Sequence, residues 1–278
     1  MGGGGGALTA LLDARLAAPV AVLARRAEVR GVFLGGSHGR GRADAWSDID
    51  LVAVAEPADH AAISDAWGTA LDAAITVVHR MERRGRTTLL NAIGADWLRI
   101  DLLLVPDLGG RARDVLAPLH DPSNLRRTLP ETLPPATPDP EQVASLTREF
   151  LRVLGLLPVG AGRGEGVTLL VGLGHLRDLL IRLMLEECPE TDRGGALHLS
   201  RLLPPARMAA LAALPNPPPE PDAIVEAHLA YAETFLPLAR TLHRRLGIAW
   251  PAAFEEATRR HLRQTLGVTL PPGGEGGR

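Results

Sequence analysis

The sequence predicts an α+β fold, in which an N-terminal mixed-sheet domain is followed by an all-helical C-terminal domain. Three observations support this prediction. Residues 28–105 contain several short apolar runs and one helical pattern, as in a mixed sheet with flanking helices. Five prolines in residues 128–140 exclude a regular element there and indicate a linker. After residue 140 the apolar residues recur at helical spacing.

The sheet domain is expected over residues 7–127. A helical pattern covers residues 7–27, in which Pro19 predicts a kink or a break. A second helix is expected over residues 58–74. The segments with the length and apolar content of strands are residues 29–34, 48–55, 75–81, 87–92 and 98–105.

The helical domain is expected over residues 141–270. Its predicted helices cover residues 141–157, 167–187, 221–246 and 251–266. The second of these is apolar nearly all round its first half, so we expect it to be central. Residues 1–6 and 271–278 lack side chains that could pack, and we expect both tails to be disordered.

Every basic residue of the chain is an arginine, and this excludes several classes of enzyme. Without lysine there can be no Schiff base to a carbonyl substrate, no Walker A phosphate loop and no kinase-type strand lysine. The single cysteine, Cys188, excludes a disulfide framework and a thiolate-rich zinc site.

The net charge and the aromatic content restrict the classes of binding partner that are expected. A net charge of −2 and 3% aromatic residues count against a nucleic-acid partner, which needs a basic face and stacking platforms. No apolar run reaches the roughly 18 residues of a membrane span, and the N-terminus does not resemble a signal peptide. We therefore expect a cytoplasmic protein with no membrane partner.

The chemistry is expected in residues 32–54. A strand runs into Gly35, Gly36 and Ser37, whose backbone could approach a phosphate closely, with Ser37 as the cap of a following helical turn. The next strand opens with Asp48 and Asp50, which project from one face about 7 Å apart along the chain. Paired carboxylates are tolerated chiefly around a cation, and oxygen ligands suit Mg²⁺.

A third carboxylate, Asp101, interrupts the apolar run of residues 98–105. A charge inside such a run needs a partner or a metal ion. If this strand lies beside that of Asp48, three carboxylates converge as in two-metal nucleotidyl transfer. A structural role for Asp101, paired with Arg99 or Arg80, is the alternative.

The order Gly-Gly-Ser, ten intervening residues, Asp-Ile-Asp at the head of a strand and a later strand aspartate resembles the nucleotidyltransferase superfamily typified by DNA polymerase β. The resemblance covers roughly residues 28–106. With a helical domain after it, the chain looks like the antibiotic nucleotidyltransferases that act on aminoglycosides or lincosamides.

This resemblance implies a Mg²⁺-dependent adenylyltransferase that moves a nucleoside monophosphate, expected to be AMP from ATP, to a hydroxyl of a small molecule. The implied catalytic residues and metal ligands are Asp48, Asp50 and Asp101. The residues implied to hold the nucleotide are Gly35, Gly36, Ser37, Arg40 and Arg42. Because lysine is absent, the basic side chain for the triphosphate would be Arg40 or Arg42, or else Arg80 or Arg99.

Several alternatives stay open at this point. The domain could bind nucleotide without catalysis, as antitoxin-like proteins do, or transfer nucleotide to RNA or protein. The general base could be Asp101, and the other candidates are Asp96, Glu82, Glu165 and Asp178. The sequence does not decide the acceptor, the preferred nucleotide or whether a homodimer completes the site.

Overall fold

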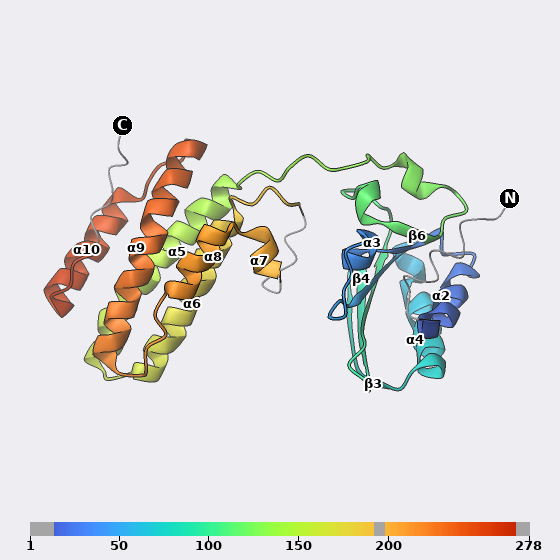
Figure 1. The fold of residues 1–278 in the computed structure, drawn as a ribbon, viewed down its shortest axis with the longest axis horizontal. Helices are drawn as coiled ribbons and strands as arrows, with labels where there is room; N and C mark the ends of the chain where they lie inside the picture. The colour runs from blue at the N-terminus through green and yellow to red at the C-terminus, as the bar shows by residue number, and fades with distance from the viewer. Residues whose placement is uncertain (1–13, 192–197, 271–278) are drawn as a thin grey trace. The chain divides into compact units, whose positions relative to one another are not determined.

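The computed structural model describes residues 14–191 and 198–270, and the chain divides into two compact units, Met1–Leu133 and Pro134–Arg278 (Figure 1). The division falls inside the proline-rich residues 128–140. The tails expected to be disordered, residues 1–6 and 271–278, lie outside the described residues. Each unit has its own buried apolar core.

The first unit is built on a mixed six-stranded sheet with the order β3-β4-β5-β2-β1-β6. Strands β2 and β5 pair in parallel, and the other neighbouring pairs are antiparallel. The strands are β1 (Gly31–Leu34), β2 (Ile49–Val54), β3 (Val77–Arg84), β4 (Thr88–Gly94), β5 (Arg99–Val105) and β6 (Ala117–His120). The α+β prediction and its five strands are confirmed. The short edge strand β6 was not predicted.

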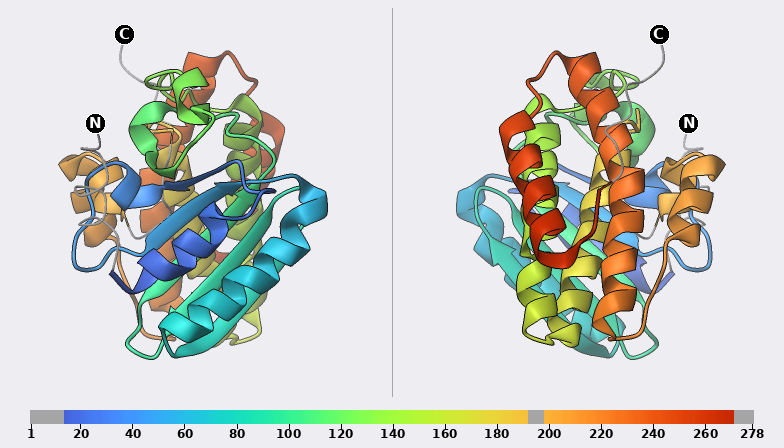
Figure 2. Two further views of the ribbon diagram at one scale, coloured as in Figure 1. Left: turned by 90° about the vertical axis from the view of Figure 1, so that its right-hand side faces the viewer. Right: turned by 90° about the vertical axis from the view of Figure 1, so that its left-hand side faces the viewer.

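Helices α2 (Ala17–Ala24) and α4 (His60–Ala74) lie against one face of this sheet, as Figure 2 shows in its left view. Ile63, Trp67 and Leu71 of α4 pack with buried residues of the central strands, among them Leu51 and Leu102. Short 3-10 turns cover Ala14–Leu16, Pro57–Asp59, Arg113–Val115 and Leu125–Thr128. The layer between these helices and the sheet is therefore a largely aliphatic core.

The opposite face of the sheet has an apolar part and a polar part. The apolar part lies toward the ends of β2 and β5, where Val52, Val54 and Val105 pack with Phe33 and Leu116. The starts of β2 and β5 carry carboxylates on this face instead. The sheet thus buries most of one face, apart from the edge strand β3, and keeps part of the other for polar groups.

Pro19 does not break the first helix. Because α2 begins at Ala17, Pro19 lies in its first turn, where a backbone N–H has no helical partner in any case. The earlier part of the predicted pattern, residues 7–13, lies outside the described residues.

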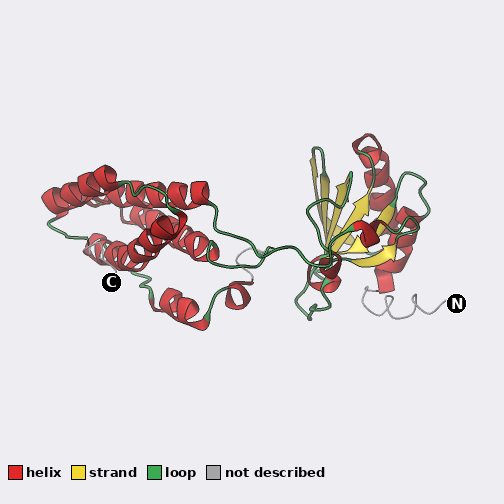
Figure 3. Ribbon diagram, turned by 90° about the horizontal axis from the view of Figure 1, so that it is seen from above, coloured by secondary structure: helices red, strands yellow, loops and turns green. Residues whose placement is uncertain are grey.

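The second unit consists of helices joined by loops, with no strand among its described residues (Figure 3). Its helices are α5 (Pro140–Gly162), α6 (Gly166–Leu185), α7 (Leu199–Leu202), α8 (Pro205–Ala213), α9 (Pro221–Leu246) and α10 (Ala252–Leu266). Phe150 of α5 stacks on Phe235 of α9 with ring centroids 3.7 Å apart, at the centre of the core. Helices α7 and α8 were not predicted.

Two expectations for this unit were wrong. Helix α5 continues past Pro158 to Gly162, where Ala161 packs against the helical core, so the one backbone hydrogen bond lost at the proline does not end the helix. Helix α6 is not buried all round, since Val167 is 72% and Val171 69% exposed. Among residues 14–191 and 198–270, no helix has the length and apolar character needed to span a bilayer.

Candidate active site

Three carboxylates lie together at the starts of β2 and β5. Asp50 and Asp101 are direct neighbours in the parallel pairing, and Asp48 immediately precedes β2. One carboxylate oxygen from each residue lies within 4.8 Å of the other two. All three side chains are partly buried. The expected convergence of these carboxylates is confirmed, and it follows from β2 and β5 being adjacent and in register.

The ionisation of Asp101 reflects this crowding. Burial raises the pKa of its carboxyl, a hydrogen bond from Asn91 opposes the rise, and the charge of Asp48 adds to it. Arg99 lowers the pKa only weakly by comparison. A cation among the three oxygens would remove this unfavourable interaction, so the donor set fits a hard divalent ion such as Mg²⁺.

A glycine turn lies directly against these carboxylates. Gly35 follows β1 and donates its N–H to Asp50 O at 2.8 Å. Gly36 then begins the one-turn helix α3 (Gly36–Gly39) with φ +52°. A Cβ on Gly36 would lie 1.8 Å from Asp50 Oδ2, so only glycine allows the turn and the carboxylate to approach this closely.

Two polar atoms of this turn are buried without a hydrogen-bond partner among the described residues. They are Ser37 Oγ and His38 Nδ1. Ser37 lies inside α3 and does not cap it, because Gly35 holds the N-cap position. The expected capping role was therefore wrong. A buried hydroxyl without a partner is costly, and a bound phosphate oxygen beside the turn would satisfy it.

The comparisons with known proteins agree with this geometry. A family model described as "Nucleotidyltransferase domain" matches residues 21–87, which include the glycine turn, Asp48 and Asp50. Residues 21–87 are thus similar to a nucleotidyltransferase domain. Asp101 lies beyond the matched residues, so the structure alone places it in the cluster.

Several solved structures are similar to the chain, and two of them are matched over most of its length. One is an aminoglycoside 6-adenyltransferase from Bacillus subtilis, at 13% identity and TM-score 0.41, covering 90% of this chain and 98% of that one. The other is a nucleotidyltransferase-like protein from Exiguobacterium sibiricum 255-15, at 14% identity and TM-score 0.32, covering 92% and 89%. Likeness at this level gives no information on substrate. No curated protein matches the chain.

The arginines predicted to bind the triphosphate differ in the contacts that they already make. Arg40 donates to Gly36 O at 3.0 Å and is thereby held on the glycine turn. Arg42 is exposed just beyond it. Arg99 donates to Trp46 O at 2.7 Å and lies 3.8 Å from Asp48. Arg80 donates a hydrogen bond to each carboxylate oxygen of Asp72. Because its guanidinium is already paired there, Arg80 is no longer a candidate for phosphate binding.

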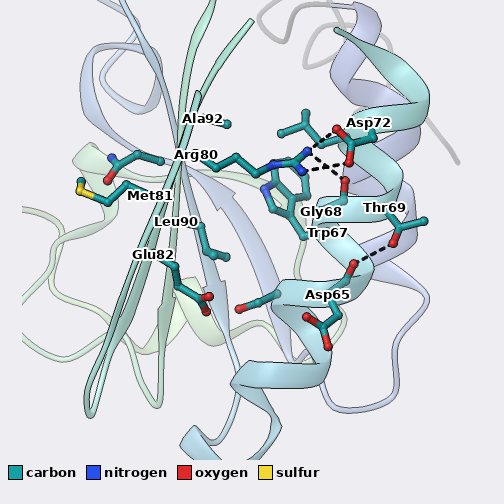
Figure 4. Close-up of a pocket in the computed structure, with 13 residues that line it drawn as sticks. Asp65, Trp67, Gly68, Thr69, Asp72, Arg80, Met81, Glu82, Leu90 and Ala92 are labelled. Carbon is teal, nitrogen blue, oxygen red and sulfur yellow. Dashed lines mark hydrogen bonds and ion pairs between the residues drawn. The ribbon is translucent and has the colours of Figure 1, made fainter. Parts of the chain in front are cut away.

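The Arg80 pair lines a cavity of about 520 Å³ between α4 and strands β3 and β4 (Figure 4). Arg80 and Glu82 pair with Ala92 and Leu90 across these strands, on the face that carries the helices. This cavity is therefore on the side of the sheet opposite to the three carboxylates.

The other candidate bases of the first unit lie away from these carboxylates. Glu82 lines the cavity, and Asp96 pairs with Arg15 at 2.7 Å. Of the candidate bases in the first unit, only Asp101 belongs to the cluster.

Sequence reasoning missed Asn91. This residue pairs with Asp101 across β4 and β5, and its Nδ2 donates to Asp101 Oδ1 at 2.6 Å. Its own Oδ1 is buried and has no hydrogen-bond partner in the described part of the chain. An amide inside the apolar segment Leu-Leu-Asn-Ala-Ile is the sequence signal that could have identified it. Asn91 is thus a positioning residue for the third carboxylate.

The first prediction concerns the close approach at Gly36. Gly36→Ala should weaken Mn²⁺ binding, measured by calorimetry, by at least about 10-fold, because the new Cβ displaces the Asp50 carboxylate. Gly41→Ala is the matched control, since Gly41 has φ +64° and open space around its Cα. Both variants should lose about 1 kcal/mol of stability from the positive φ. Equal metal affinity in the two variants would contradict the predicted role of Gly36.

The second prediction concerns Asn91. Asn91→Leu should weaken Mn²⁺ binding about 10-fold, because Asp101 loses the donor that orients it. The melting temperature in EDTA should stay the same or rise, since an unsatisfied buried amide oxygen is removed. Asn216→Leu is the control, because it removes an amide that accepts from Arg177 in the second unit. A loss of metal affinity that merely follows a loss of stability would count against this role.

The third prediction follows from the raised pKa of Asp101. A raised pKa in the folded state means that stability falls as pH rises from the ordinary aspartate value through the raised one. Asp101→Asn should therefore raise the melting temperature of the metal-free protein by about 2 °C at pH 7.5, and by less at pH 4.5. Asp65→Asn, an exposed carboxylate on α4, should show no such gain. A lower melting temperature of Asp101→Asn at pH 7.5 would contradict the prediction that the ionised Asp101 carboxylate destabilises the metal-free protein.

Proposed function

We propose that this nucleotidyltransferase moves a nucleoside monophosphate, expected to be AMP from ATP, to a hydroxyl group of a small molecule, with Mg²⁺ as cofactor. The observation that carries the proposal is the cluster of Asp48, Asp50 and Asp101 packed against the glycine turn. Phosphoryl chemistry of this kind depends on positioning and on neutralising charge, and needs little covalent chemistry from the protein.

In this proposal the three aspartates hold Mg²⁺. Bound there, the ion would neutralise charge on the triphosphate and support the leaving pyrophosphate. Gly35 and Gly36 let the nucleotide approach the backbone, and Ser37 Oγ donates to a phosphate oxygen. The proposed cationic ligands of the triphosphate are Arg40, which the turn already holds, and Arg42.

Asp101 is the proposed acceptor of the proton from the attacking hydroxyl. Among the candidate bases of the first unit, it is the one that lies in the carboxylate cluster, where the reacting phosphorus is proposed to bind. Asn91 fixes the orientation of the group through one oxygen. A base must lie within hydrogen-bond reach of the reacting hydroxyl, and the partial exposure of Asp101 leaves room for such a substrate.

We further propose that the acceptor is an antibiotic of the aminoglycoside or lincosamide class, and that the reaction takes place in the cytoplasm, where ATP is available. Two features support this acceptor class. One is the order of the motifs in the first unit, and the other is the helical second unit, Pro134–Arg278, which has a core of its own. A separate helical unit suits an enzyme with its own acceptor site better than a bare nucleotide-binding domain.

The test is release of pyrophosphate from each NTP with Mg²⁺ and a panel of these antibiotics. Asp50→Asn should lower the rate by at least about 100-fold, because it removes a proposed metal ligand itself. The matched control is Asp65→Asn, on the opposite side of the sheet. An Asp50→Asn protein with full activity would disprove the metal site. Tight binding of Mg²⁺·ATP without turnover on any acceptor would favour the non-catalytic alternative.

A further inference from the structure

Two of the four tryptophans are almost fully exposed. Trp46 is 85% and Trp97 76% exposed, whereas Trp67 is 3% exposed and Trp250 packs edge-on against His243. Neither exposed indole makes a stacking or cation–π contact with another described residue. In a chain with 3% aromatic residues, leaving two large apolar rings in water is unexpected without a ligand.

Both tryptophans belong to the end of the sheet that carries the carboxylates. The parallel pairing aligns Ile49 with Ile100, and its continuation places Asp48 opposite Arg99. Trp46 and Trp97 each precede that pair by two residues. Arg99 connects the two segments, because it donates to Trp46 O at 2.7 Å and lies 3.8 Å from Asp48.

The backbone at Trp97 is strained. Trp97 has φ +63°, a conformation that is unfavourable for a bulky side chain and ordinary for glycine. Hydrogen bonds from Trp97 N to Gly94 O and from Gly94 N to Leu98 O, both 2.9 Å, hold this turn between β4 and β5. Strain that is kept at an exposed indole next to a catalytic cluster points to a role for the ring itself.

The order of groups across the sheet suggests which part of a ligand would reach the rings. The glycine turn follows β1, the carboxylates lie on β2 and β5, and the turn of Trp97 joins β5 to β4. Here the inference rests on the proposed function. With the phosphate tail on the glycine turn and the reacting phosphorus at the carboxylates, the nucleoside extends toward β5 and the two tryptophans.

We propose that Trp46 and Trp97 form a binding site for the nucleobase of the donor nucleotide. A purine presents two flat faces, and stacking on an indole tolerates any base while favouring the larger ones. The pair would therefore set the preference for ATP over smaller phosphate compounds.

The test compares Mg²⁺·ATP with inorganic triphosphate, which shares the phosphates and lacks the base. Trp46→Leu and Trp97→Gly should each weaken ATP binding about 10-fold in calorimetry and leave triphosphate binding unchanged. Trp97→Gly also relieves the positive φ, so its melting temperature should not fall. The matched control is Asn124→Gly, at the other non-glycine residue with positive φ among the described residues, +53°. It should leave both affinities unchanged.

Three results would overturn the nucleobase site. They are unchanged ATP affinity with a raised KM for the acceptor, equal weakening of ATP and triphosphate, and a wild-type protein that binds ATP no better than triphosphate. Failure of the proposed function looks different. Wild-type protein with a tryptophan-dependent preference for ATP, but with no pyrophosphate release on any acceptor, would disprove the transfer reaction and leave the nucleobase site standing.

Discussion

The mutual repulsion of three carboxylates is the constraint on which the rest of the sheet unit depends. Oxygens of Asp48, Asp50 and Asp101 lie within 4.8 Å of one another and are partly buried, where their charges repel. Among the described residues, the amide of Asn91 and the guanidinium of Arg99 offset part of this repulsion. Flexible loops would let such groups move apart. They are instead held at the starts of β2 and β5, the two central strands, where pairing on both sides fixes the backbone.

The register of these strands is maintained by the opposite face. Leu51 and Leu102 are neighbours of the aspartates along β2 and β5, and both are buried under α2 and α4. A slip of one residue would expose these leucines and bury the aspartates against the helices, so the apolar layer also fixes the position of the polar cluster. The stability of the helix-covered face and the geometry of the candidate site therefore have the same origin.

Because the chain has no lysine, any basic side chain that binds the triphosphate must be an arginine, and the structure reduces the number of candidates. Several arginines near the sheet already have partners: Arg80 binds Asp72, and Arg99 lies between Asp48 and Trp46. Arg40 donates to a backbone carbonyl of the glycine turn, which places a permanently charged guanidinium there. A planar guanidinium fixed in this way suits phosphate oxygens better than a mobile ammonium group would.

The sequence by itself determined the strands of the sheet, the glycine turn and the three aspartates, because alternation, glycine spacing and a charge in an apolar run are local signals. It did not identify Asn91, whose role comes from its partner on β5, or β6, a strand of four residues that exists only because β1 pairs with it. It also overestimated the burial of α6, since an apolar residue such as Val171 does not indicate whether a neighbour covers it. Cross-strand partners and burial arise from contacts between residues far apart in the chain, so only the tertiary structure could decide them.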